Sequence, residues 1–200
     1  MSTSNLLLEA KGITKYFGTI TALENVNLKV HAGECLGVVG DNGAGKSTLM
    51  KVLSGLYKPS AGSLFFQGKE EVLESPRDSQ NLGLEMVYQD LALAGNLPIG
   101  ENIFLGREPT KNLGFIKLLD FNKIKELTNA HLDKLKINVK SADQKGEELS
   151  GGQRQAVAIA RSTAFNAKVV IMDEPTAALA IKEVGKVLDL INSLKKQVLE

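Results

Sequence analysis

The chain has 200 residues, of which 43% are hydrophobic and 24% are charged, and its formal net charge is +1. This length allows one sizeable core with at most a smaller appended subdomain, and the composition excludes a fibrous or disordered chain. A charge so close to zero also argues against broad electrostatic capture of nucleic acid or anionic lipid.

The sequence shows no targeting signal, and its single cysteine gives the only indication of the redox compartment. The longest apolar stretches fall far below the roughly 20 residues that cross a bilayer, and the N-terminus lacks the basic start and apolar core of a secretory signal. Cys35 is the single cysteine, so it forms no internal disulfide and fits a reducing compartment, most simply as a buried thiol. We therefore expect a cytoplasmic chain.

The first half of the chain is predicted to open with β structure. Alternating apolar residues over 26–30 predict a half-exposed antiparallel strand, and the run CLGVV at 35–39 predicts a buried one. A glycine-rich loop over 40–48 follows. Further strands are predicted at 64–67 and 84–88. The helix predicted after the glycine-rich loop carries its apolar residues at helical spacing, at Leu49, Val52, Leu53 and Leu56.

The second half changes in character. Residues 100–148 are predicted to be mainly helical, with an amphipathic helix over 121–135. A helix is expected to follow LSGGQRQ and to run to about Thr163. The run KVVIM at 168–172 predicts a buried parallel strand, and a final helix begins near Ile181.

The glycine-rich loop matches the phosphate-binding pattern G-x-x-x-x-G-K-[ST] at Gly40, Gly45, Lys46 and Ser47. In such a loop the backbone amides wrap phosphate oxygens, the lysine reaches the outer phosphates, and the serine hydroxyl suits Mg²⁺. A chance match from this composition is expected in about 0.02 of such chains. A glycine-rich turn of no function is therefore the weaker interpretation.

Two carboxylates, Asp173 and Glu174, follow the predicted strand VVIM. Beside a phosphate loop, Asp173 suits a Mg²⁺ ligand and Glu174 suits the base that polarises the attacking water. Alone, such a pair would be a solvated acidic turn. In LSGGQRQ the glycines let backbone amides approach a phosphate, and Ser150 caps the following helix.

In this order, GDNGAGKST, Gln89, LSGGQRQ and VVIMDEP resemble the ATP-binding subunit of an ATP-binding cassette transporter. The resemblance covers nearly the whole chain. It implies an α/β P-loop NTPase fold of the RecA-like type, with an N-terminal antiparallel β part and an inserted helical subdomain. A single domain over 1–200 would divide into a nucleotide-binding core, 1–90 and 160–200, and a helical subdomain, 91–159.

The resemblance also implies roles for individual residues. Catalysis would depend on Glu174, Lys46 and Gln89, and Mg²⁺ would be held by Ser47, Gln89 and Asp173. The signature segment acting in trans would comprise Ser150, Gly151, Gly152 and Gln153. ATP would be bound by Phe17, with Tyr16 as the alternative stacking ring, and by Gly40, Asn42, Gly43, Ala44, Gly45, Lys46, Ser47 and Thr48. His31 and His131 match no family motif and are interpreted as structural or surface residues.

The family forms dimers in which each ATP lies between one subunit's phosphate loop and the other's signature segment, attached to a membrane permease and, in importers, a solute-binding protein. The segments EPTAAL and ENIFLGREP resemble the branch that imports simple sugars. One departure is Ala180, which stands where the family commonly has an aspartate. We expect part of the apolar run Leu91, Leu93, Leu97, Ile99 and Phe104 to form an exposed groove for the permease, or else to fill the insert's own core.

Two other classes remain for comparison. A soluble cassette acting on ribosomes or chromosomes is the alternative, although the former usually carries two cassettes and the latter long coiled coils, which are not evident here. A small GTPase would need N-K-x-D, and the NKIK segment at 122–125 lacks the aspartate.

The ATP-binding cassette family also places a further strand, ending in a histidine, after the glutamate that corresponds to Glu174. Only 26 residues follow Glu174 and none is histidine, so we expect a truncated cassette that binds ATP but hydrolyses it poorly.

Overall fold

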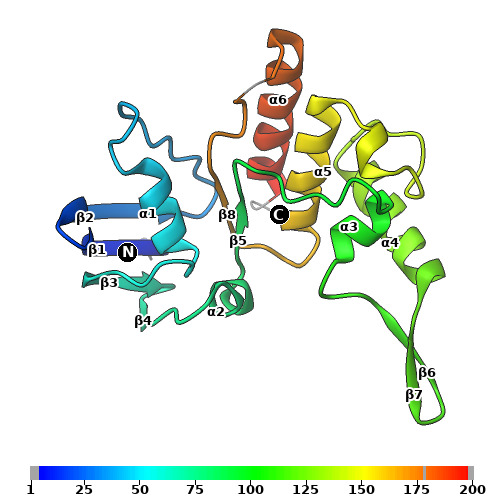
Figure 1. The fold of residues 1–200 in the computed structure, drawn as a ribbon, viewed down its shortest axis with the longest axis horizontal. Coiled ribbons are helices and arrows are strands. Elements are labelled where there is room, and N and C mark those ends of the chain that lie inside the picture. The colour runs from blue at the N-terminus through cyan, green and yellow to red at the C-terminus, as the bar shows by residue number, and fades with distance from the viewer. Residues whose placement is uncertain (1–4, 178, 198–200) are drawn as a thin grey trace. The chain divides into compact units, whose positions relative to one another are not determined.

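The computed structural model describes residues 5–177 and 179–197, which form two compact units (Figure 1). The first unit contains residues up to 86, residues 166–173 and the chain from 195. The second contains residues 87–165 and 174–194. The predicted boundaries at 90, 91, 159 and 160 are not tested by this division and remain a prediction.

An antiparallel sheet organises the first unit. Its strands are β1 (Leu6–Phe17), β2 (Ile20–His31), β3 (Ala61–Phe66) and β4 (Lys69–Glu71), in the order β2-β1-β3-β4. The alternation at 26–30 is confirmed, because Val26, Leu28 and Val30 are half-buried while their neighbours are exposed. The core of this unit combines strand residues such as Leu8, Ile13 and Leu64 with the apolar face of α1.

Helix α1 (Lys46–Leu53) follows the glycine-rich loop, as predicted. Its residues Leu49, Val52 and Leu53 are buried against the sheet. Leu56 is 42% exposed, contrary to the predicted spacing. The reason is that the helix ends at Leu53, with Ser54 as its C-cap, so Leu56 lies beyond the helix and not on its inward face.

The segment CLGVV is a second correction. Residues 35–39 belong to no strand, Val39 is 92% exposed, and Cys35 is an exposed thiol rather than a buried one. A continuous apolar run raises the tendency to form a strand, but pairing still needs a neighbouring strand with a free edge. In this structure the segment connects β2 to the glycine-rich loop without regular secondary structure.

Strands β5 (Leu84–Val87) and β8 (Val169–Met172) form a two-stranded sheet. The amides of Lys168 and Val169 both donate to the carbonyl of Gly83, so the two strands begin side by side and run parallel. The prediction of a parallel strand at 168–172 is therefore confirmed, although β8 is only partly buried apart from Ile171.

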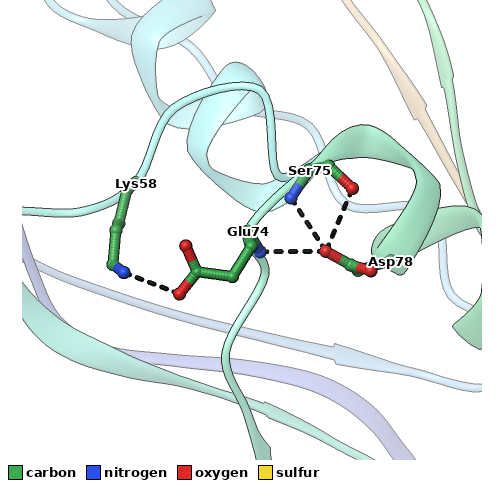
Figure 2. A network of polar contacts seen from close by, with 4 residues as sticks. All are labelled: Lys58, Glu74, Ser75 and Asp78. Carbon is green, nitrogen blue, oxygen red and sulfur yellow. Dashed lines mark hydrogen bonds and ion pairs between the residues drawn. The ribbon is translucent and has the colours of Figure 1, made fainter.

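Helix α2 (Pro76–Leu82) was not predicted from the sequence. Its start is stabilised by Asp78, whose Oδ2 accepts from the amides of Glu74 and Ser75 at 3.0 and 2.8 Å and from the Ser75 hydroxyl at 3.0 Å (Figure 2). Lys58 donates to the Glu74 carboxylate at 2.7 Å in the same network. The acidic residue in the first turn thus satisfies donors that the helix itself leaves unpaired.

The second unit is mainly helical, as expected for the insert. It contains α3 (Ile99–Phe104), α4 (Phe121–Lys134), a short 3₁₀ helix (Gly146–Glu148), α5 (Gly151–Thr163) and α6 (Ile181–Gln197) up to Leu194. The predictions of α4, α5 and α6 are confirmed. Ile99 and Phe104 are 0% and 6% exposed, so these two residues of the apolar run fill the core, while Leu91, Leu93 and Leu97 are half-buried.

The insert also contains a hairpin that the sequence reasoning missed. Strands β6 (Thr110–Leu113) and β7 (Ile116–Leu119) pair antiparallel, and Figure 1 shows them extending away from the helices of their unit. Gly114, at φ 63°, occupies the two-residue turn, where a positive φ matches the twist of the strands.

Candidate nucleotide-binding site

The glycine-rich loop leads directly into α1. Gly43 and Gly45 have φ values of 84° and 86°. Gly45 is the N-cap of the helix, and no side chain caps the helix start. A Cβ on Gly45 would lie 2.5 Å from the carbonyl oxygen of Ala22, so only glycine fits there. The first amides of a helix have no acceptor within the helix, and a glycine at the N-cap has no side chain that could accept from them. These amides are thus available to an anion such as a phosphate.

The side chain of Lys46 lies over this loop. Its Nζ donates to the carbonyl of Gly40 at 2.7 Å and to that of Asp41 at 2.8 Å. These bonds hold the ammonium charge beside the loop backbone, in a place where it can attract phosphate oxygens. Of the residues predicted to bind ATP, 40–48 thus form one continuous segment around this charge.

Ser47 and Asp173 are 126 residues apart in the sequence but adjacent in the first unit. The Ser47 hydroxyl donates to Asp173 Oδ1 at 3.0 Å, and Asp173, just after β8, is only 6% exposed. A hydroxyl and a carboxylate suit Mg²⁺, which is usually held by few protein oxygens together with substrate phosphates. Within the described residues no group of three or more His, Cys, Asp or Glu side chains could hold a metal by itself. The two oxygens present, those of Ser47 and Asp173, are of the type that Mg²⁺ binds.

Gln89 and Glu174 meet in the second unit. Gln89 Nε2 donates to Glu174 Oε2 at 3.2 Å, and the contact is exposed to solvent. Glu174 has φ 49°, in the left-handed region that non-glycine residues rarely adopt. Such backbone conformations cost about 1–3 kcal/mol and are often found at functional sites. Two of the residues on which catalysis is expected to depend thus lie within hydrogen-bond distance of each other.

The signature segment opens α5. Ser150 is the N-cap, its hydroxyl oxygen accepts from the amide of Gln153 at 3.2 Å, and the Gln153 side chain accepts from the Ser150 amide at 3.0 Å. This is the reciprocal capping box that S-x-x-Q predicts. Gln153 Nε2 also donates to the carbonyl of Asn138 at 3.0 Å. Gly151 and Gly152 are therefore the first two residues of this helix, at its capped start, where backbone amides lack partners within the helix.

Sequence reasoning missed Glu183, in the first turn of α6. Its Oε1 accepts from the hydroxyl of Ser150 at 3.2 Å and from the amide of Gly152 at 3.1 Å. The Gly152 amide lowers the pKa of Glu183 most, burial opposes it, and smaller lowering contributions come from Ala180, Ser150 and Lys186. No motif indicated this residue, because the contact joins two helices that are distant in the sequence.

Phe17, the predicted adenine-stacking ring, ends β1. It is 42% exposed and packs edge-to-face against Tyr57, with ring centroids 5.3 Å apart. Tyr16, the alternative, is 49% exposed. Tyr57 was not predicted from the sequence. Phe17 has exposed ring surface on which a base could stack, and its role stays a prediction.

His31 and His131 have the contacts of a surface residue and a structural residue, respectively. His31 is exposed and its Nδ1 lies 3.0 Å from the Glu34 carboxylate. His131, on α4, places Nε2 2.9 Å from the carbonyl of Ala160 and 3.1 Å from the Thr163 hydroxyl. In residues 5–177 and 179–197, no helix is both long and apolar enough to span a membrane.

Comparison with known proteins gives consistent matches. Residues 23–177 match the family described as ABC transporter. The chain is 49% identical over 191 residues to the xylose/arabinose import ATP-binding protein of Sulfolobus acidocaldarius, covering 96% of this chain and 74% of that protein. It is 44% identical over 195 residues to the fructose import ATP-binding protein of Rhizobium meliloti, covering 96% and 75%. It spans only 36–38% of the length of several longer sugar-import relatives.

Solved structures agree. The nucleotide-free ATP-binding cassette of an ABC transporter superimposes with a TM-score of 0.83 at 29% identity, over 96% of this chain and 78% of that one. A dimeric ATP-binding cassette in a post-hydrolysis state, bound to ADP and Pi, gives a TM-score of 0.75 at 28% identity, over 96% and 84%. With the phosphate loop, the signature segment and these matches in agreement, the chain belongs to the ABC transporter family of ATP-binding cassette ATPases.

Proposed function

We propose that this chain is the ATP-binding and ATP-hydrolysing subunit of an importer for a small solute, in particular a simple sugar. The observation that supports it most is the phosphate loop, in which Gly43 and Gly45 adopt positive φ and Lys46 lies over the loop backbone. The names of the relatives, which import xylose, arabinose and fructose, support the sugar assignment. They favour import over a soluble cassette that acts on ribosomes or chromosomes.

In this proposal each loop residue has a task. The uncapped amides at the start of α1 bind phosphate oxygens, and Lys46 turns from the loop carbonyls to the outer phosphates. Ser47 and Asp173 would hold Mg²⁺, with Gln89 as a further ligand. When bound, Mg²⁺ would neutralise charge on the phosphates. Phe17 would stack on adenine.

Glu174 is the proposed general base. Its carboxylate would accept a proton from the water that attacks the terminal phosphate, and the Gln89 amide, 3.2 Å away, would orient that carboxylate and the water. The strained backbone at Glu174 would fix the direction of its side chain. Loss of the carboxylate should therefore lower turnover while leaving nucleotide affinity nearly unchanged.

The proposal includes assembly with other proteins. Two copies would pair so that Ser150, Gly151, Gly152 and Gln153 of one reach the nucleotide of the other, and dimeric cassettes among the similar structures support such pairing. The partners would be a membrane permease and a solute-binding protein, with this subunit at the cytoplasmic face of the membrane. Half-buried Leu91, Leu93 and Leu97 remain candidates for the permease contact.

Nucleotide binding by the Lys46→Ala variant tests the proposal. Removing the ammonium deletes the main charge over the loop, so affinity for a fluorescent ATP analogue with Mg²⁺ should fall at least about tenfold, or 1.4 kcal/mol. Lys51→Ala, on the same helix, is the matched control because it removes an equal charge away from the loop. Equal affinity of the Lys46→Ala variant and the parent would refute the phosphate loop as the binding site.

A further inference from the structure

We infer that Glu183 occupies the anion-binding position of the signature segment in the free subunit, and that an incoming phosphate must displace its carboxylate before two subunits can close. The inference rests on the proposed function, because it concerns the proposed signature contact with the partner's nucleotide. It adds an acidic side chain that regulates this contact from within the same chain.

The hydrogen bonds of Glu183 support the first step. One oxygen, Oε1, accepts from both the Ser150 hydroxyl, at 3.2 Å, and the Gly152 amide, at 3.1 Å. A serine hydroxyl and a backbone amide each have one hydrogen to donate. Both donors are therefore engaged by the carboxylate, and a phosphate oxygen can use them only after Glu183 has released them.

The Glu183 side chain fills the space beside Gly152. A Cβ placed on Gly152 would lie 2.9 Å from Glu183 Oε1 and 3.0 Å from its Cδ and Cγ. The volume in front of the glycine is thus already filled by the Glu183 side chain. The Gly152 amide itself already donates to this carboxylate at 3.1 Å, so a phosphate oxygen can accept from the amide only after the carboxylate has moved.

Charge gives the third step. The N-terminal end of α5 carries the positive end of the helix dipole, which favours an anion there. The same amide lowers the pKa of Glu183, so the side chain is an anion at neutral pH. A carboxylate and a phosphate that shared the same two donors would repel each other because both are anions. Only one of the two anions can therefore hold the site.

Glu183 is also able to leave. It stands in the first turn of α6 and is only partly buried, and three rotatable bonds separate its carboxylate from the backbone. Rotation of the side chain can therefore free Ser150 and Gly152 without unfolding either helix. The segment would then stay ordered in the free subunit and exchange one anion for another on closure.

The first test measures the site in the single subunit. The Glu183→Gln variant keeps the shape of the side chain but removes its charge, and Asp189→Asn, on the same helix, is the matched control. Inorganic phosphate is titrated while the Gly152 amide is followed by NMR, with the Gly45 amide as an internal reference for the phosphate loop. We expect the Gly152 amide to respond at roughly tenfold lower phosphate in Glu183→Gln, since charge-assisted hydrogen bonds are about twice as strong as neutral ones. The response of Gly45 should not change.

The second test measures closure. Dimerisation is followed by sedimentation with Mg²⁺ and a non-hydrolysable ATP analogue, and Glu183→Gln should dimerise about tenfold more tightly than Asp189→Asn. The same Gly152 response in parent and Glu183→Gln, or weaker dimerisation of Glu183→Gln, would overturn the inference, since the carboxylate would then only hold the segment in shape. If no variant dimerises but the Gly152 response shifts as expected, Glu183 does occupy the anion position, and it is the proposed pairing of subunits that fails.

Discussion

Gly45 shows how one residue can decide whether the phosphate loop forms. It combines φ 86° with a backbone oxygen, that of Ala22, 2.5 Å from where a Cβ would be. Gly43 has nearly the same φ, 84°, but nothing within 4 Å of its Cβ position. Substitution of Gly43 would therefore cause backbone strain alone, whereas substitution of Gly45 would cause the same strain together with steric overlap.

Gly45→Ala should therefore lower the free energy of unfolding by about 3 kcal/mol, the sum of left-handed strain and overpacking. Gly43→Ala should lower it by only about 1 kcal/mol, through strain alone. Urea unfolding of both variants measures the difference. Equal losses would mean that the close approach of β2 to the loop does not constrain Gly45.

His131 gives a pH-dependent prediction at the same scale. Burial lowers the pKa of His131 below its ordinary value of 6.5, and Lys134 adds to the effect, while the bond to the Ala160 carbonyl opposes it. The unfolded chain thus takes up the proton at a higher pH than the folded chain. Stability from this residue is fully present above pH 6.5 and is lost as pH falls from there toward the lowered folded pKa.

His131→Leu should remove this part of the pH dependence and cost about 1 kcal/mol at neutral pH through the lost hydrogen bond. The measurement compares urea midpoints of parent and variant at pH values above and below 6.5, where the carboxylates contribute equally to both. If the difference between the two proteins is the same at every pH, His131 does not titrate differently on folding.

Among the elements, the start of α2 provides a contrast between two charged contacts in one network (Figure 2). Asp78 accepts three hydrogen bonds at the helix start, whereas the Lys58 and Glu74 side chains are 63% and 65% exposed. Capping contacts satisfy donors that would otherwise lack partners, while exposed ion pairs compete with water and salt.

We therefore expect Asp78→Ala to lower the free energy of unfolding by about 1–2 kcal/mol and Lys58→Ala by less than about 0.5 kcal/mol. Thermal unfolding of the two variants tests this order. A Lys58→Ala variant less stable than Asp78→Ala would show that the ion pair, rather than the cap, stabilises the start of α2.

Elements with a local signal were the ones that the sequence predicted well. Helix α5 follows from Ser150 and Gln153, whose capping box depends on residues three apart. The run at 35–39 failed because its pairing depends on distant strands, and the β6–β7 hairpin was hidden by a sequence that suggested helix on both sides. In the site, motifs identified the loop at 40–48, whereas Glu183 came only from the contact between α5 and α6.

On the scale of the whole molecule, the proposed site residues divide between the two units. The first unit contains the phosphate loop with Phe17 and Asp173, and the second contains Gln89, Glu174 and the signature segment. The proposed function requires the signature segment to act on the nucleotide of another copy. The proposed function therefore depends on whether nucleotide drives two copies to associate.

Sedimentation velocity of the chain, with and without Mg²⁺ and a non-hydrolysable ATP analogue, measures this association. We predict that the parent converts from monomer to dimer only when the nucleotide is present. Lys46→Ala, which binds the nucleotide at least about tenfold more weakly, and Ser150→Ala, which lacks the hydroxyl donor in the signature segment, should both remain monomeric at an analogue concentration that just saturates the parent. A parent that binds the analogue but remains monomeric, or a Ser150→Ala variant that dimerises as tightly as the parent, would contradict the proposed pairing of subunits.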